Sequence, residues 1–111
     1  MIKTIGTAYK RDDFTNEEFW EYWLNVHAPI SREAPGLRGY VVNEVVRRIA
    51  GDLEVEAFVE QWYDDEDALE RATNSPQGQA AWEDVGRYAK TSGTFWIAKQ
   101  HVIVPPPVDQ G

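Results

Sequence analysis

Apolar and polar positions first follow a strand pattern and then change to a helical spacing. Residues 2–10 are short, β-tolerant and free of proline, and they predict a first strand. Thr15 followed three residues later by Glu18 predicts a capping box, because each side chain can bind the backbone N–H next to the other. A helix is therefore expected to begin at this point.

The predicted helix carries a broad apolar arc when its residues are placed about 100° apart. His27 lies on this arc among aromatic and aliphatic side chains, which are Phe19, Trp20, Trp23, Leu24, Val26 and Ile30. Pro29 disfavours helical angles at Ala28, so the regular helix is expected to end at about His27 or soon after. His27 is thus predicted to face the interior of the protein.

A turn and two strands are expected next. Pro35 and Gly36 predict a type II turn, because proline supplies a φ of about −65° and glycine accepts a positive φ. Residues 37–48 and 54–63 then predict two strands of a hairpin. The first of these strands has apolar residues on both faces, which suits a sheet covered by helices on one side and by another sheet on the other.

Two more helices and a last strand follow from local signals. Asp64 or Asp65 can cap one helix, and Ser75 followed by Pro76 marks the start of another. The acidic run at this first helix start is typical of a solvated first turn. Residues 95–104 predict the final strand.

Together the elements predict one α+β domain. Their order, β-α-β-β-α-β, is that of the ferredoxin-like arrangement of an antiparallel sheet and helices. The domain is expected to span residues 1–104, followed by an extended tail at residues 105–111.

Composition and charge then exclude several classes of protein. Nineteen acidic residues against 11 basic ones give a net charge of −8, which repels phosphate backbones and anionic lipid headgroups, so neither nucleic acid nor a membrane is an expected partner. No apolar run approaches the roughly 20 residues of a transmembrane helix, and a cytoplasmic location is expected. Because cysteine is absent, disulfides, thiolate nucleophiles and cysteine-based metal sites are excluded.

One histidine and one tyrosine are the main candidates for chemistry. His27 titrates near neutrality and could serve as a general acid or base, or it could be a core histidine bonded to backbone at a helix end. Tyr40 could hydrogen-bond a carbonyl or phenol oxygen, or it could be an ordinary buried strand tyrosine. His101 is more simply explained as a surface or edge residue.

An aromatic pocket for a flat, largely apolar ligand is a further possibility. Its candidate substrate-binding residues are Trp23, Val42, Trp62 and Trp82. Each tryptophan taken singly is also explained by a place in the core. No metal-ligand spacing, phosphate-binding loop or dinucleotide fingerprint is present, so neither a metal nor a cofactor is expected, and catalysis would rest on acid–base chemistry.

Three motifs resemble those of the EthD family of small dimeric α+β barrel proteins. They are FxxYWxxxHAP at 19–29, PGLRGYVV at 35–42 and SPQG at 75–78. The likeness extends from the first strand to Val104. It implies a ferredoxin-like monomer whose sheet packs on that of a second copy, and hence a homodimer through the sheet face.

The family is functionally mixed. It includes proteins linked to bacterial ether degradation, fungal polyketide decarboxylases or dehydratases, and the related methylmuconolactone methylisomerase, in which a histidine and a tyrosine at the spacing of His27 and Tyr40 are implicated at the active site. The resemblance implies a cofactor-independent isomerase or lyase that transfers protons on a small cyclic, aromatic or polyketide-like compound. Two alternatives stay open: an oxidoreductase or haem-linked protein with His27 as a haem ligand, and a non-catalytic ligand-binding accessory dimer.

Overall fold

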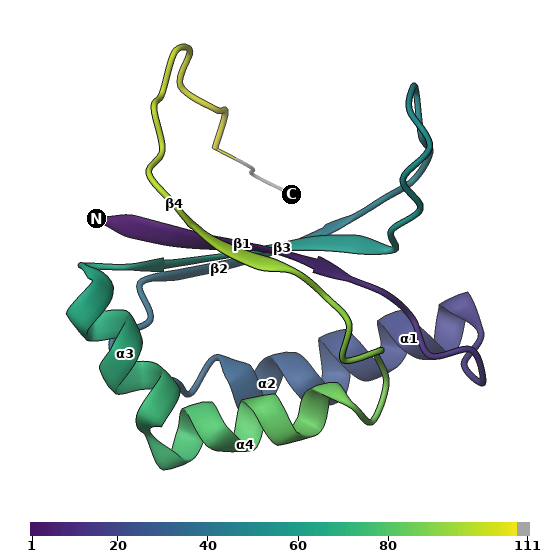
Figure 1. Cartoon of the computed structure of the whole chain (residues 1–111), viewed down its shortest axis with the longest axis horizontal. Helices are drawn as coiled ribbons and strands as arrows, with labels where there is room; N and C mark the ends of the chain where they lie inside the picture. The colour runs from purple at the N-terminus through teal and green to yellow at the C-terminus, as the bar shows by residue number, and fades with distance from the viewer. Residues whose placement is uncertain (109–111) are drawn as a thin grey trace.

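The computed structural model describes residues 1–108, which form a four-stranded antiparallel sheet with helices against one face (Figure 1). The strands are β1 (Ile2–Ala8), β2 (Gly39–Glu44), β3 (Ala57–Tyr63) and β4 (Phe95–Ala98), in the spatial order β2-β3-β1-β4. This arrangement confirms the predicted ferredoxin-like α+β fold. Residues 109–111, the end of the predicted tail at 105–111, lie outside the described residues.

The first helical region continues past Pro29, so the predicted end near His27 is wrong. Its segments are α1 (Asn16–Tyr22), a π-helical turn (Trp23–His27) and α2 (Ala28–Ser31). The region begins at the predicted capping box of Thr15. The wider turn lets the Ala28 N–H bond to the Trp23 carbonyl, and Pro29 then occupies the first turn of α2, where a missing N–H costs little. His27 therefore lies within a continuous helical region.

The other two helices begin where the sequence predicts. They are α3 (Glu66–Asn74), capped by Asp65, and α4 (Pro76–Val85), capped by Ser75. The two helices meet at a tight corner, where a Cβ on Gly78 would lie 2.0 Å from the carbonyl oxygen of Ala72. A side chain at position 78 would therefore force the corner apart.

The predicted strands are all longer than the observed ones. The four predictions were 2–10, 37–48, 54–63 and 95–104. Within residues 1–108, β4 pairs with β1 alone, and its last paired residue, Ala98, lies opposite Lys3 near the start of the chain. Beyond Glu44 the hairpin between β2 and β3 extends away from the sheet on the side opposite the helices, past the end of β1 (Figure 1). Beyond Glu44 the two arms of the hairpin still meet, because the Val45 N–H donates a hydrogen bond to the Glu56 carbonyl at 3.0 Å, but no regular ladder continues.

The core lies between the sheet and the helices in two clusters. The first contains Phe19, Trp23, Ala57, Tyr88 and Ala89, and the second contains Tyr63, Ala68 and Ala72. Phe19 and Asp84 are the largest side chains that are almost completely buried. A buried carboxylate next to an aromatic core calls for partners, because an unpaired charge is costly to remove from water.

Among residues 1–108, no helix has the length and apolar character needed to cross a bilayer.

Candidate active site

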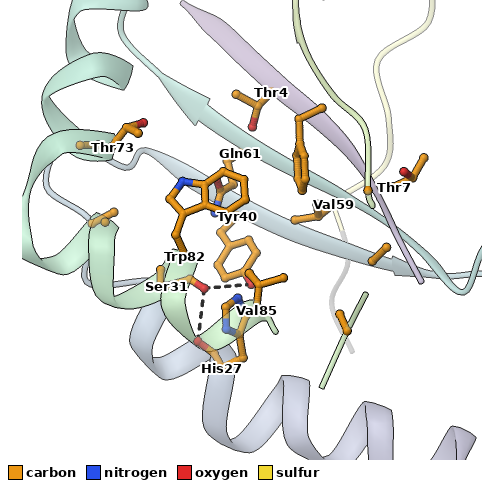
Figure 2. Close-up of a pocket in the computed structure, with 18 of the residues that line it drawn as sticks. Thr4, Thr7, His27, Ser31, Tyr40, Val59, Gln61, Thr73, Trp82 and Val85 are labelled. Carbon is orange, nitrogen blue, oxygen red and sulfur yellow. Dashed lines mark hydrogen bonds between the residues drawn. The ribbon is translucent and has the colours of Figure 1, made fainter. Parts of the chain in front are cut away.

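A cavity of about 530 Å³ lies between the helices and the sheet (Figure 2). This volume falls in the usual range for small-ligand sites, roughly 300–1,000 Å³. Four of the six predicted site residues line it, namely Trp23, His27, Tyr40 and Trp82. Most of the remaining wall is apolar.

Two of the predicted substrate-binding residues do not line this cavity. Val42 lies two residues beyond Tyr40 on β2 and packs against the core instead. Alternate residues of a strand point to opposite faces, so Gln61 faces the cavity and Trp62 faces away from it. The Trp62 ring lies under the ammonium group of Lys3, which is 5.2 Å from the ring centroid.

His27 is held by a buried carboxylate from α4. Its Nδ1 atom lies 2.9 Å from Oδ2 of Asp84, and the two residues are only 6% and 1% exposed. The other carboxylate oxygen accepts hydrogen bonds from the Tyr22 hydroxyl at 2.8 Å and from Arg87 at 3.2 Å. Asp84 is thus fixed from three sides and can fix the orientation of the imidazole ring in turn.

Asp84 was not among the predicted site residues, although the sequence holds a signal for it. It lies three residues after Ala81 and four residues before Tyr88, on the apolar side of its helical region. A carboxylate on the buried stripe of a helix requires a partner. Its pairing with His27, 57 residues away, depends on how the helices pack.

Burial and pairing set the charge states of this pair. Burial lowers the pKa of His27 below 6.5, although Asp84 acts in the opposite direction. Burial alone would raise the pKa of Asp84, but hydrogen bonds from Tyr22 and His27 outweigh it and keep that pKa below 3.8. At neutral pH the carboxylate is therefore ionised and the imidazole is neutral, with its Nδ1 proton donated to Asp84.

The second ring nitrogen of His27 is available to a ligand. No hydrogen bond to Nε2 occurs within residues 1–108. Every fully buried side-chain nitrogen or oxygen in that range has a partner, so Nε2, which has none, is not fully buried. The Nε2 atom is therefore reachable from the cavity that His27 lines. An acceptor nitrogen in a cavity, with a carboxylate on the opposite ring nitrogen, is the arrangement of a general base.

The hydroxyl of Tyr40 is positioned by two neighbours, one of which, Ser31, is drawn beside it (Figure 2). It accepts a hydrogen bond from Nε1 of Trp23 at 3.0 Å and lies 3.4 Å from Oγ of Ser31. Ser31 donates its own hydrogen to the His27 carbonyl at 3.2 Å, so Tyr40 supplies the proton in its contact with Ser31. A contact of 3.4 Å is weak, and a ligand oxygen in the cavity could replace Ser31 as the acceptor.

Tyr88 covers the imidazole from the core side. Its ring centroid is 4.9 Å from that of His27, and the residue is 2% exposed. Burial, with a smaller contribution from Tyr40, raises the pKa of the Tyr88 phenol, so the ring stays neutral. The imidazole therefore lies between a neutral aromatic ring and an ionised carboxylate.

The second histidine, His101, is exposed, as expected for a surface residue. In the described part of the chain, no three histidine, aspartate or glutamate side chains lie close enough together to bind a metal ion.

Comparison with known proteins identifies similar domains and structures. Residues 11–92 match the EthD domain. The chain is similar to an ethyl tert-butyl ether D (EthD) family protein from Bacillus halodurans C-125, with 28% identity and a TM-score of 0.78 over 91% of this chain and 100% of that chain. A comparison with curated proteins finds no match.

Two more distant structures share the fold alone. A dimeric ferredoxin-like protein of unknown function from Thermobifida fusca YX is 17% identical, with a TM-score of 0.70 over 89% of this chain and 90% of that chain. SnoaB from Streptomyces nogalater, a cofactor-independent oxygenase, is 14% identical, with a TM-score of 0.62 over 93% of this chain and 97% of that chain.

Proposed function

The chain belongs to the EthD family, and we propose that it is a cofactor-independent enzyme that transfers a proton on a small cyclic, aromatic or polyketide-like compound. The observation that carries this proposal is the state of His27, whose Nδ1 is bound to Asp84 and whose Nε2 is open to the cavity. Isomerisation, decarboxylation, and cyclisation with dehydration are all reactions that such a proton transfer could serve.

The proposed mechanism places two side chains against the substrate, and Asp84 supports one of them. Nε2 of His27 removes a proton from carbon, and the imidazolium that forms is stabilised by the carboxylate of Asp84. The Tyr40 hydroxyl donates a hydrogen bond to the substrate oxygen on which negative charge develops. The same imidazolium then returns the proton to another atom of the substrate, so an isomerisation leaves the enzyme unchanged.

Hydrogen–deuterium exchange tests this proposal without knowledge of the natural substrate. β-Tetralone is a neutral bicyclic ketone with an acidic C–H next to its carbonyl, and the protein in D₂O should accelerate exchange at that carbon, as followed by proton NMR. His27→Ala should lower the protein-dependent rate about a hundred- to ten-thousand-fold. His101→Ala is the matched control and should leave it unchanged, because His101 is exposed. Equal rates for the wild type and His27→Ala would overturn the proposal.

Tyr40→Phe tests the second role. This variant keeps the ring and removes the hydroxyl that Trp23 and Ser31 hold in place. The exchange rate should fall about a hundredfold, the usual effect of losing one donor to a developing oxyanion. An unchanged rate in a variant with normal thermal stability would remove Tyr40 from the mechanism.

An oxidative function is the second candidate, because SnoaB shares the fold and is a cofactor-independent oxygenase. In this alternative the same base would deprotonate a phenol, and molecular oxygen would be the co-reactant. Oxygen uptake with a phenolic probe that disappears in His27→Ala would favour it. Lack of uptake together with His27-dependent exchange would favour proton transfer alone.

Haem binding is a further oxidative alternative. The open Nε2 of His27, with Asp84 on Nδ1, is a suitable donor for iron, and haem would supply redox chemistry at that position. Titration with hemin tests it: a Soret shift in the wild type that is absent in His27→Ala would support ligation. Tight retention of a metabolite without any conversion would instead support a non-catalytic binding protein.

We also propose that the protein is a homodimer formed through the open face of the sheet, which is the face that the helices do not cover. Val41 is 43% exposed on that face, and the hairpin that extends beyond it carries Val46 and Ile49, which are 91% and 93% exposed. Exposed apolar side chains on this face and its hairpin favour a protein partner over solvent. The Thermobifida fusca relative is described as dimeric. A dimer would have twice the 12.7 kDa mass of the chain.

A further inference from the structure

Three of the small polar residues that line the cavity already have hydrogen-bond partners for their side chains. Thr7, Ser31 and Thr73 each bond to backbone atoms of the chain. The half-buried side chains of Thr4 and Gln61 also line the cavity, but neither has a hydrogen-bond partner within residues 1–108. Their polar atoms are therefore free to bind a ligand.

The register of the sheet brings these two side chains into one row with Tyr40. Gln61 on β3 lies directly opposite Tyr40 on β2 and directly opposite Thr4 on β1. Neighbouring strands are about 4.8 Å apart, and residues directly opposite one another point to the same face. All three side chains are on the helix-facing side of the sheet, where they line the cavity (Figure 2). Gln61 is at the centre of the row.

An amide at this position has no evident structural purpose. Gln61 lies on one of the two central strands, between the cavity-lining residues Val59 and Tyr63 of its own face. An apolar side chain would fill this place without the free-energy cost of an unpaired polar group. The amide offers two N–H donors and a carbonyl acceptor, so it can bind either a carbonyl or a hydroxyl group.

The charge of the cavity lining indicates a neutral ligand. Lys90 is the one lysine or arginine that lines the cavity in the described part of the chain, and its ammonium group is paired with Asp12 at 3.0 Å. The nearest buried charge at His27 is the negative one of Asp84. A ligand carboxylate would thus lose its hydration on entering the cavity and find no unpaired cation there.

We propose that Gln61, assisted by Thr4, is a specificity-determining subsite for a second oxygen of the substrate. The substrate class is then a neutral ring compound with at least two oxygen functions, one bound by Tyr40 and the other by Gln61. The assignment of the first oxygen rests on the proposed function. Because the amide both donates and accepts, it can hold the second oxygen as a ketone before proton transfer and as an enol after it.

Two aromatic probes that differ by one hydroxyl group test the subsite. Naphthoresorcinol carries two hydroxyls and α-naphthol carries one, and their dissociation constants can be measured by quenching of tryptophan fluorescence, since Trp23 and Trp82 line the cavity. The wild type should bind naphthoresorcinol about tenfold more tightly, which corresponds to one net hydrogen bond. Gln61→Leu should abolish this preference, because the hydrogen bond to the second hydroxyl is lost. The variant should bind α-naphthol within about twofold of the wild type, because that probe has no second hydroxyl.

Matched variants make the test specific. Gln77→Leu changes an exposed glutamine of α4 and should keep the full preference. Thr4→Val should reduce the preference about twofold to threefold, as expected for a weaker secondary contact. If Gln61→Leu does not fold, Gln61→Asn shortens the amide without adding an apolar group and should also lose the preference. A preference that persists in both Gln61 variants, or is absent from the wild type, would overturn the subsite.

The experiments distinguish failure of the subsite hypothesis from failure of the proposed function. His27→Gln should lose β-tetralone exchange and keep the preference for naphthoresorcinol, because it leaves Gln61 in place. A preference that depends on Gln61 with exchange that does not depend on His27 would sustain the subsite and refute the base. Exchange that depends on His27 with no effect of the Gln61 variants on probe binding would do the opposite.

Discussion

The two faces of the sheet differ in how their polar groups are satisfied. On the open face, Glu60 accepts a hydrogen bond from Lys3 at 2.6 Å and another from Asn43 at 3.0 Å. On the covered face, the next residue of the same strand, Gln61, has no partner within residues 1–108. A polar group that is paired within the chain contributes to the fold, whereas an unpaired one in a cavity remains available to a ligand.

The apolar residues of the two faces differ in the same way. The covered face packs against helices around Phe19, which is 0% exposed, whereas Val41 on the open face is 43% exposed. The covered face therefore provides most of the stability of the monomer, and the open face has apolar surface left for a partner.

The largest expected effect is on the free energy of unfolding, which should depend far more on the covered face than on the open face. Phe19→Ala should lower the free energy of unfolding by about 3–5 kcal/mol, because it removes a fully buried aromatic ring. Val41→Ala, measured in urea at a concentration at which the protein is monomeric, should cost less than about 1 kcal/mol, as is usual for exposed positions. Equal losses for the two variants would contradict the comparison.

A carboxylate-to-amide change tests the polar network of the covered face. In Asp84→Asn the amide can donate to Nδ1 of His27, which places the remaining ring proton on Nε2. The acceptor in the cavity is then lost, and exchange of β-tetralone should slow about a hundredfold or more, which is roughly 3 kcal/mol in the barrier. Asp13→Asn, at an exposed aspartate paired with Arg11, is the control and should keep the wild-type rate.

The pH dependence of exchange reports the burial of His27. Its pKa lies below 6.5, so most of the imidazole is neutral at and above that pH, and the larger part of the fall in rate should come below it. Stability should fall in the same direction, because the unfolded chain binds a proton at a higher pH than the folded one does. A rate that begins to fall well above pH 6.5 would show that His27 is not buried in the way described.

A charge on the open face should weaken the proposed dimer. Val41→Glu places a carboxylate on a surface expected to lose water on association, and the dimer dissociation constant should rise at least about tenfold. Light scattering after gel filtration measures the mass, and Gln77→Glu, which adds a carboxylate at an exposed position of α4, serves as the control. A wild-type protein that is monomeric at all concentrations would refute the dimer, while the exchange assay would still test the base.

The smallest effect concerns the paired group of the open face. Lys3 and Asn43 hold the pKa of Glu60 below 4.5, so its contribution to stability is present above that pH and is lost as the pH falls through the lowered value. Glu60→Gln should cost about 0.5–1 kcal/mol at pH 7 in urea denaturation, and the cost should vanish in strong acid. A cost that does not change with pH would indicate a packing effect.

Local sequence signals predicted the starts of the helices accurately. The capping box at Thr15 and the pair Ser75 and Pro76 act within a few residues, so their outcome is already contained in the sequence. Strand ends and the continuation past Pro29 were predicted less well. They depend on which backbone lies alongside and on a π-helical turn that no local pattern indicated.

The candidate site could likewise be predicted only in part. The inward position of His27 follows from helical spacing, and the alternation of a strand places Tyr40 and Gln61 on one or other face. Their functional setting does not follow, because Asp84 reaches His27 across 57 residues and Gln61 meets Tyr40 across 21. The side-chain chemistry and the local directions are thus encoded along the chain. The partners are set by packing, since contacts between distant residues arise only when the sheet and helices come together.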